Sequence, residues 1–222
     1  MKNVTVVVPA YNEEKTISKA IKILKNHGYN SVIVVDDGSK DNTYELALKE
    51  GAKVYRHIIN RGLGGALNTG ISASLMNGAE FIVTFDADLQ HNPKDIKKLI
   101  DALNLGYDVA IGNRINKNMP LIRRIGNKGL DFFTWIIFGK YVHDTQSGLR
   151  AFTRNAASKI NLRTNRMEVS SEIIREVSIN KLKLREVPID AIYTEYSQSK
   201  GNTSFIDGIK ILTKLMFRRI ME

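Results

Sequence analysis

Short apolar runs alternate with amphipathic stretches along the first half of the chain. The apolar runs are residues 4–8, 32–35, 52–55, 81–85 and 107–112. Their length and composition predict buried strands. The stretches between them that carry apolar residues at helical spacing are 13–26, 41–50, 62–77 and 93–105. Strands alternating with helices imply right-handed crossovers, so we predict an α/β fold with a mostly parallel, doubly wound sheet.

The second half of the chain is less regular. We expect strands over 149–153 and 184–189, and a helix over 170–180. Residues 193–204 are polar and predict a loop, whereas 205–220 predict a C-terminal amphipathic helix. Prolines are expected to end two of the strands, at Pro9 and Pro188. No linker separates these segments, so we predict a single domain over residues 1–222.

Composition and charge narrow the classes of function. The chain has 222 residues, 43% of them hydrophobic, no cysteine, and four histidines without metal-ligand spacing. Disulfides, thiolate chemistry and a zinc site are therefore not expected. No run approaches the ~18–20 apolar residues that span a bilayer, and the start reads as a strand, so we expect a cytoplasmic protein. The net charge of +10 predicts an anionic partner, although no nucleic-acid motif accompanies it.

Two aspartates follow the apolar run in FIVTFDADLQHNP, residues 81–93. Asp86 and Asp88 come directly after this run, with Gln90 and His91 beyond them. Ligands of open α/β sheets bind outside the carboxyl ends of the strands, and paired carboxylates there suit Mg²⁺ or Mn²⁺. A substrate diphosphate would supply the remaining oxygens. A solvated acidic turn is the alternative.

Three other loops carry candidate binding groups. Carboxylates in residues 9–13 and 36–39 can accept hydrogen bonds from a nucleobase or a ribose. The segment Asn60-Arg61-Gly62-Leu63-Gly64-Gly65-Ala66 is glycine-rich and opens a helix. These glycines either line a ligand or allow close packing of the helix on the sheet, and the sequence leaves both readings open.

The motifs VVVPAYNEE, VVDDGSKDNT, NRGLGGALNTG and FDADLQHNP together resemble family-2 glycosyltransferases with a GT-A fold, over roughly the first 115 residues. The later segments IGNRI, RRIGNKG and HDTQSGLRAF resemble the dolichyl- or polyprenyl-phosphate hexose synthase branch. The resemblance implies a nucleotide-sugar-binding half over 1–115 and an acceptor-binding half over 116–222.

The resemblance also implies roles for individual residues. Asp86, Asp88 and Gln90 would hold the metal and the diphosphate. The residues expected to bind the nucleotide sugar are Pro9, Tyr11, Glu13, Asp36, Asp37, Arg61, Gly62 and Asp86. Arg114 and Lys128 would contact phosphates. Relatives usually have arginine in a Ser-Arg-Gly context at the second position, and lysine keeps the charge without the bidentate geometry.

The acceptor decides whether a base is needed. A phosphate monoester is largely dianionic at neutral pH and needs no protein base. A sugar hydroxyl would need a carboxylate near the anomeric carbon, and Asp144 is the candidate. A structural role for Asp144 in the turn 144–148 is the equal alternative.

Residues 114–140 combine bases with large apolar side chains. The bases are Arg114, Lys117, Arg123, Arg124, Lys128 and Lys140, against the single acid Asp131. This mixture suits a lipid phosphate, and an ordinary core helix with basic side chains at its surface is the alternative. The helix 205–220 carries Lys210, Lys214 and Arg218, and it would lie on an anionic membrane, pack on the sheet or form a dimer.

These observations predict an inverting, metal-dependent glycosyltransferase. It would move a hexosyl unit from a GDP-mannose or UDP-glucose type donor to a polyprenyl phosphate. It would act from the cytoplasm, peripherally at the inner face of the cell membrane, or through a homodimer or a membrane-protein partner. The alternatives are a glycosyltransferase with a hydroxyl acceptor and a nucleotide-sugar-binding module without catalysis.

Overall fold

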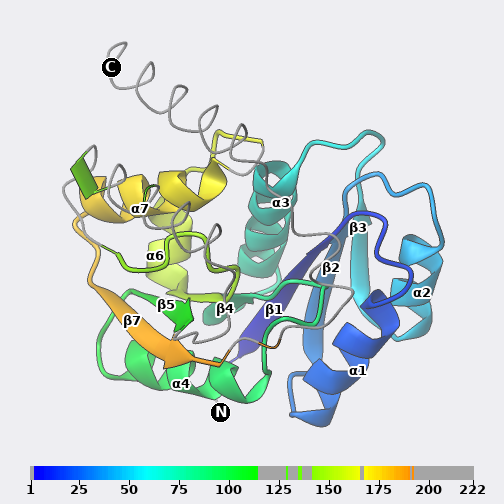
Figure 1. Cartoon of the computed structure of the whole chain (residues 1–222), viewed down its shortest axis with the longest axis horizontal. Helices are drawn as coiled ribbons and strands as arrows, with labels where there is room; N and C mark the ends of the chain where they lie inside the picture. The colour runs from blue at the N-terminus through cyan, green and yellow to red at the C-terminus, as the bar shows by residue number, and fades with distance from the viewer. Residues whose placement is uncertain are drawn as a thin grey trace.

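The computed structural model describes residues 3–114, 129, 135–136, 142–165, 168–190 and 192. A 7-stranded sheet forms its centre, in the order β3-β2-β1-β4-β6-β5-β7 (Figure 1). The strands are β1 Val4–Ala10, β2 Ser31–Asp36, β3 Lys53–Arg56, β4 Phe81–Thr84, β5 Val109–Arg114, β6 Arg150–Thr153 and β7 Leu184–Ile189. Strand β6 is antiparallel to both of its neighbours, and all the other pairs are parallel. The predicted α/β fold is confirmed.

Helices cover both faces of the sheet. They are α1 Ile17–Asn26, α2 Thr43–Lys49, α3 Leu63–Met76, α4 Lys94–Asn104, α6 Arg154–Lys159 and α7 Val169–Ile179. Neighbouring residues of β1 contribute to the cores on opposite faces of the sheet, because successive side chains of a strand point to opposite faces. Val6 and Val8 belong to a core cluster with α1 and α4, whereas Val7 belongs to a second cluster with α3, α6 and α7.

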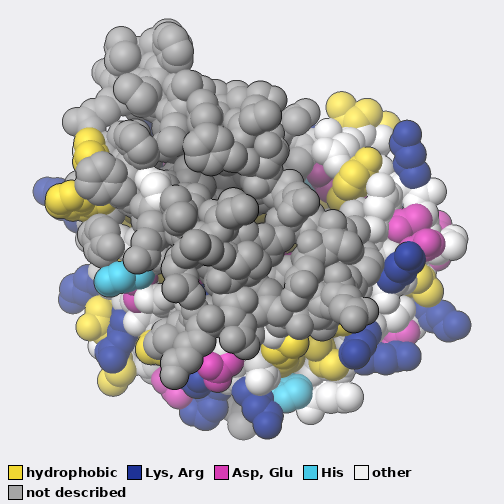
Figure 2. Space-filling model, viewed as in Figure 1, with side chains coloured by type: hydrophobic (Ala, Val, Ile, Leu, Met, Phe, Trp, Pro, Cys, Tyr) yellow, Lys and Arg dark blue, Asp and Glu magenta, His cyan; other side chains and the backbone are white. Residues whose placement is uncertain are grey.

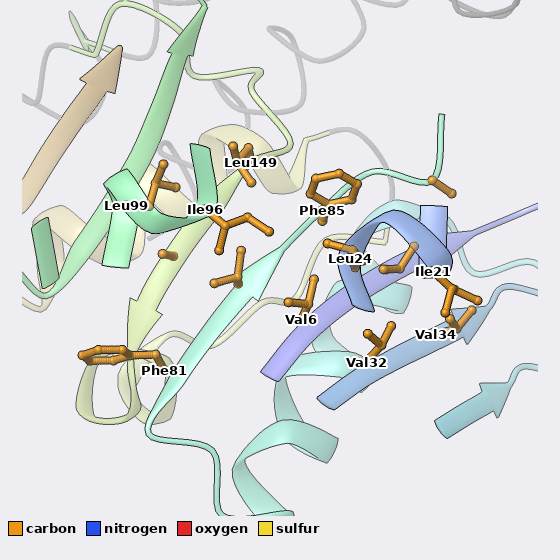
Figure 3. Close-up of a cluster of buried hydrophobic side chains, with 14 of the residues drawn as sticks. Val6, Ile21, Leu24, Val32, Val34, Phe81, Phe85, Ile96, Leu99 and Leu149 are labelled. Carbon is orange, nitrogen blue, oxygen red and sulfur yellow. The ribbon is translucent and has the colours of Figure 1, made fainter. Parts of the chain in front are cut away.

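The first cluster reaches the carboxyl end of β4. Figure 3 shows Ile21 and Leu24 of α1 over the valines of β1 and β2, and Ile96 and Leu99 of α4 over the neighbouring strands. Phe85 and Leu149 complete this cluster, and both are fully buried. Because Phe85 immediately precedes Asp86, the core fixes the backbone from which the predicted metal-binding loop departs.

Strand β1 continues past Pro9 to Ala10, so the prediction that Pro9 ends its strand is wrong, whereas β7 ends at Ile189, directly after Pro188, as expected. Val7 accepts a hydrogen bond from the Phe85 amide, so its polar groups face β4. Pro9, two residues further, faces the same side, where the β1–β4 pairing has already ended at Thr84. The missing N–H of Pro9 therefore costs no ladder bond. Pro188 lies in β7, an edge strand, where proline is also tolerated.

Two helices differ from the sequence expectation. Helix α1 begins at Ile17, because residues 13–16 form a turn in which Glu13 accepts the Thr16 and Ile17 amides. Helix α6 was not predicted, and it is short enough to escape a periodicity analysis. Thr153 caps it by accepting a hydrogen bond from the Ala156 amide.

Several predictions fall outside the described residues. They are Lys128 and most of the basic stretch 114–140, the loop 193–204 and the amphipathic helix 205–220. Within the part of the chain that the structure describes, no helix has both the length and the apolar character to cross a membrane.

Candidate active site

The loops after β1 and β2 are joined by hydrogen bonds at the carboxyl edge of the sheet. The Asn12 amide donates to Ser39 Oγ over 2.9 Å, and the Lys40 amide donates to Asn12 Oδ1 over 2.9 Å. The Glu13 amide donates to Thr43 Oγ1, over 2.8 Å. The two predicted nucleotide-binding loops therefore form one unit. Tyr11 remains 42% exposed on it, so its ring is available to a ligand.

The carboxylates of Asp36 and Asp37 are engaged inside the protein. Asp36 accepts the Ser39 amide and lies 3.1 Å from Arg56 Nε. Asp37 Oδ1 accepts the Arg61 amide and lies 2.6 Å from His57 Nδ1. Asp37 Oδ2 accepts the Gly62 amide over 2.6 Å. Asp37 therefore anchors the start of the glycine-rich segment.

The structure favours the packing role of the glycines. The Gly64 and Gly65 amides, which open α3, donate to the Asn165 carbonyl. A Cβ at Gly64 would overlap the backbone of Thr164, and a Cβ at Gly70 would overlap the Val7 side chain. Since these amides already have protein acceptors, they are not presented to a phosphate as a phosphate loop requires.

Asp86 and Asp88 each turn one oxygen toward the protein. Asp86 Oδ2 lies 3.2 Å from His91 Nε2, and Asp88 Oδ1 accepts the Gln90 amide over 3.0 Å. Leu89, directly after Asp88, has a φ of 64°, an unusual conformation for leucine that is found at functional turns. Asp86 Oδ1 and Asp88 Oδ2 accept no hydrogen bond from the described residues, so the pair can offer two oxygens to a cation.

The pKa values of the two aspartates move apart. Burial pushes the pKa of Asp86 upward, but the His91 hydrogen bond and the charges of His91, Arg150 and Arg114 together lower it. Burial, followed by the charge of Asp86, raises the pKa of Asp88 to about 6. Two close carboxylates repel each other in this way, and a divalent cation between them would favour the ionised form of both.

Arg114 and Asp144 form a bidentate ion pair. Asp144 Oδ2 accepts from Arg114 Nε over 2.7 Å, and Oδ1 accepts from Nη2 over 2.8 Å. The Arg114 amide adds a third bond to Oδ2, over 3.1 Å. Asp144 is 5% exposed, so the pair is largely shielded from water. The structural alternative for Asp144 therefore has direct geometric support.

A buried arginine near this pair was missed by the sequence reasoning. Arg150 on β6 is 1% exposed, and its Nη2 donates to the Thr145 carbonyl and to Ser170 Oγ. Burial lowers its pKa to about 10, against the charges of Asp86 and Asp144. The only sequence signal that pointed to Arg150 was its position within the segment HDTQSGLRAF.

The donor set fits a hard divalent cation that a substrate helps to coordinate. The described residues contain no group of three His, Cys, Asp or Glu side chains that could hold a metal alone. The two aspartate oxygens match the usual coordination of Mg²⁺, which takes one or two carboxylates and completes its shell with water and phosphate. The backbone of Gln90 takes part in the loop, where its carbonyl accepts the Ile192 amide over 2.8 Å.

The fold and this edge of the sheet define a glycosyltransferase of the GT-A type. The family model for glycosyl transferase family 2 matches residues 5–161, and the chain belongs to this family. The predicted family, fold and enzyme class are thus confirmed.

Curated relatives match almost the whole chain. An uncharacterized protein from Methanocaldococcus jannaschii is 55% identical, over 97% of this chain and 91% of its own length. A protein from Methanococcus voltae, named UDP-N-acetylglucosamine–dolichyl-phosphate N-acetylglucosaminyltransferase, is 42% identical over 99% of this chain and 97% of its own. A dolichol-phosphate mannosyltransferase from Pyrococcus furiosus is 33% identical, over 91% of this chain and 60% of its own length.

Solved structures agree in fold. Glucosyl-3-phosphoglycerate synthase from Mycobacterium tuberculosis, crystallised with Mn²⁺, UDP-glucose and phosphoglyceric acid, has a TM-score of 0.75. The match covers 96% of this chain and 79% of that one, at 19% identity. At this identity the likeness shows the fold alone.

Proposed function

We propose that this enzyme transfers a hexosyl unit from a nucleotide-diphosphate sugar to a polyprenyl phosphate, with inversion and with a divalent metal. The observation that carries the choice of acceptor is the Arg114–Asp144 pair. The candidate base is held by two bonds to a guanidinium, so it is poorly suited to take a proton from a hydroxyl. A phosphate acceptor needs no base.

The donor diphosphate would lie over Asp86 and Asp88. When bound there, Mg²⁺ or Mn²⁺ acts as a Lewis acid that neutralises charge on the leaving diphosphate. Residues of the protein would bind the nucleoside and the acceptor. The joined loops after β1 and β2, with the exposed Tyr11, would bind the nucleoside. Arg114, held in place by Asp144, would contact the phosphate of the acceptor.

We further propose UDP-N-acetylglucosamine as the first donor to test. The relative from Methanococcus voltae carries this donor and dolichyl phosphate in its name, and it aligns over 99% of the chain. GDP-mannose and UDP-glucose are the next candidates. The relative from Pyrococcus furiosus, at lower identity, is named a mannosyltransferase and supports a mannosyl donor.

A panel of donors and acceptors tests this function. UDP-N-acetylglucosamine, UDP-glucose and GDP-mannose are each incubated with Mn²⁺ and either a short polyprenyl phosphate, the free polyprenol or a free sugar. We expect one donor to label the polyprenyl phosphate and to leave the polyprenol unlabelled. Efficient labelling of the free sugar, with an inert lipid phosphate, would instead support the glycan-acceptor alternative. Donor binding without any transfer or hydrolysis would support the binding module.

Peripheral membrane contact is the part of the proposal that concerns Lys210, Lys214 and Arg218. Figure 2 shows basic and acidic side chains around the described rim of one face. Each base of the C-terminal stretch is worth ~1 kcal/mol near an anionic membrane. We expect sedimentation with anionic but not neutral vesicles, lost at high salt and in a variant with all three bases changed to glutamine. Equal binding to neutral vesicles would point to apolar insertion.

A further inference from the structure

The Asp86 carboxylate occupies the space that a side chain on Gly148 would fill. A Cβ on Gly148 would overlap both the Oδ and the Cγ atoms of Asp86. The φ of Gly148 lies outside the left-handed region, so its backbone would accept alanine. The requirement for glycine at this position therefore comes from the Asp86 carboxylate.

His91 holds the same carboxylate from another side. It is 2% exposed, and its Nε2 lies 3.2 Å from Asp86 Oδ2. A carboxylate only accepts, so Nε2 carries the hydrogen. Among the described residues Nδ1 has no hydrogen-bond partner, and the Phe85 and His91 rings pack in a T-shaped arrangement at a centroid distance of 5.8 Å. The polar interaction of this buried imidazole is thus with Asp86.

A competing partner explains why Asp86 needs such support. The charge of Arg150 acts on Asp86, and the buried Nε of Arg150 has no hydrogen-bond partner within the described part of the chain. Without the His91 hydrogen bond, the attraction of Arg150 would favour orientations of the Asp86 carboxylate that face this guanidinium, because a buried donor without an acceptor is costly. Asp86 Oδ1 would then be less available to a cation.

We propose that His91 and Gly148 are positioning residues that fix Asp86 Oδ2 against the protein and present Oδ1 to the metal, next to Asp88. This inference rests on the proposed metal-dependent function. Residues that orient metal ligands in this way typically contribute about 10–100-fold to metal affinity.

Matched variants separate a hydrogen-bonding role from simple packing. His91→Gln places an N–H donor near the position of Nε2, whereas His91→Leu keeps volume without a donor. Gly148→Ala displaces the same carboxylate by steric overlap. His27→Leu, at the end of α1, controls for the loss of any histidine. Thermal midpoint and far-UV circular dichroism check that each variant is folded.

The readout is Mn²⁺ affinity, measured by electron paramagnetic resonance with UDP present. We expect His91→Leu and Gly148→Ala to weaken Mn²⁺ binding by about tenfold or more, while His91→Gln retains most of the affinity. Folded His91→Leu protein that binds Mn²⁺ like the wild type would overturn the inference, and so would equal losses in His91→Gln and His91→Leu. If wild-type protein binds no Mn²⁺, the metal-dependent function fails with it, so the two failures are distinguishable.

Discussion

Replacing Asp144 by asparagine tests whether Asp144 positions Arg114 or acts as a general base. Asparagine keeps an oxygen for Arg114 but loses the negative charge and places an amide against a guanidinium. The Arg114 side chain is 13% exposed and that of Asp144 is 6%, so water compensates little. Removing one partner of a buried pair costs ~3–5 kcal/mol, and the retained acceptor argues for about 3 kcal/mol. For a chain of 222 residues, at ~2–4 °C per kcal/mol, Tm should fall by about 6–12 °C.

The kinetic expectation follows from the same contacts. If Asp144 acts through Arg114, then Asp144→Asn and Arg114→Gln lower kcat/KM to a similar extent, and the double variant is hardly worse than either. Such non-additivity marks residues that act as a unit. The assay is transfer to polyprenyl phosphate, well below the Tm of each variant, with Tm measured in parallel.

One result would refute this reasoning. Removing a general base typically costs about 10²–10⁴-fold in rate. A loss of that size in Asp144→Asn, with unchanged Tm and nearly normal Arg114→Gln activity, would make Asp144 a base. The acceptor would then be a hydroxyl.

Four further predictions concern Asp88 and the packing of α3. Asp88→Asn should abolish transfer, as excess EDTA should for the wild type, and full activity in EDTA would end the metal-dependent reading. The pKa of Asp88 is raised to about 6, so its ionisation opposes folding as the pH rises through the interval between its unfolded and folded pKa values. Without metal at pH 7, Asp88→Asn should therefore melt at or above the wild-type Tm, and a large decrease would contradict the repulsion between Asp86 and Asp88. Protons also compete with the cation, so Mn²⁺ affinity should fall about tenfold per pH unit below pH 6, as a titration at several pH values would show. Gly70→Ala should lower stability by about 1–3 kcal/mol in urea unfolding, because the new methyl meets Val7, and unchanged stability would refute the close packing of α3 on β1.

The local features of this protein were predictable from its sequence. The strands of the first half lie within a few residues of their predicted positions, because apolar runs of that length need burial on both faces of a sheet. The position of Asp86 and Asp88 at a strand end followed from the same pattern. The order of the motifs then indicated the family that the family model confirms.

The tertiary structure decided which of the candidate groups are already engaged by the protein. Asp37 is engaged by the Gly62 amide, 25 residues away, and Asp144 by Arg114, 30 residues away. Gly148 and His91 both contact the Asp86 carboxylate. The Asn165 carbonyl accepts hydrogen bonds from the Gly64 and Gly65 amides, which a phosphate loop would have offered to a ligand. Sequence patterns report periodicity within one element. Partners from different strands and loops meet only when the sheet brings its carboxyl edge together, so their contacts leave no local pattern to read.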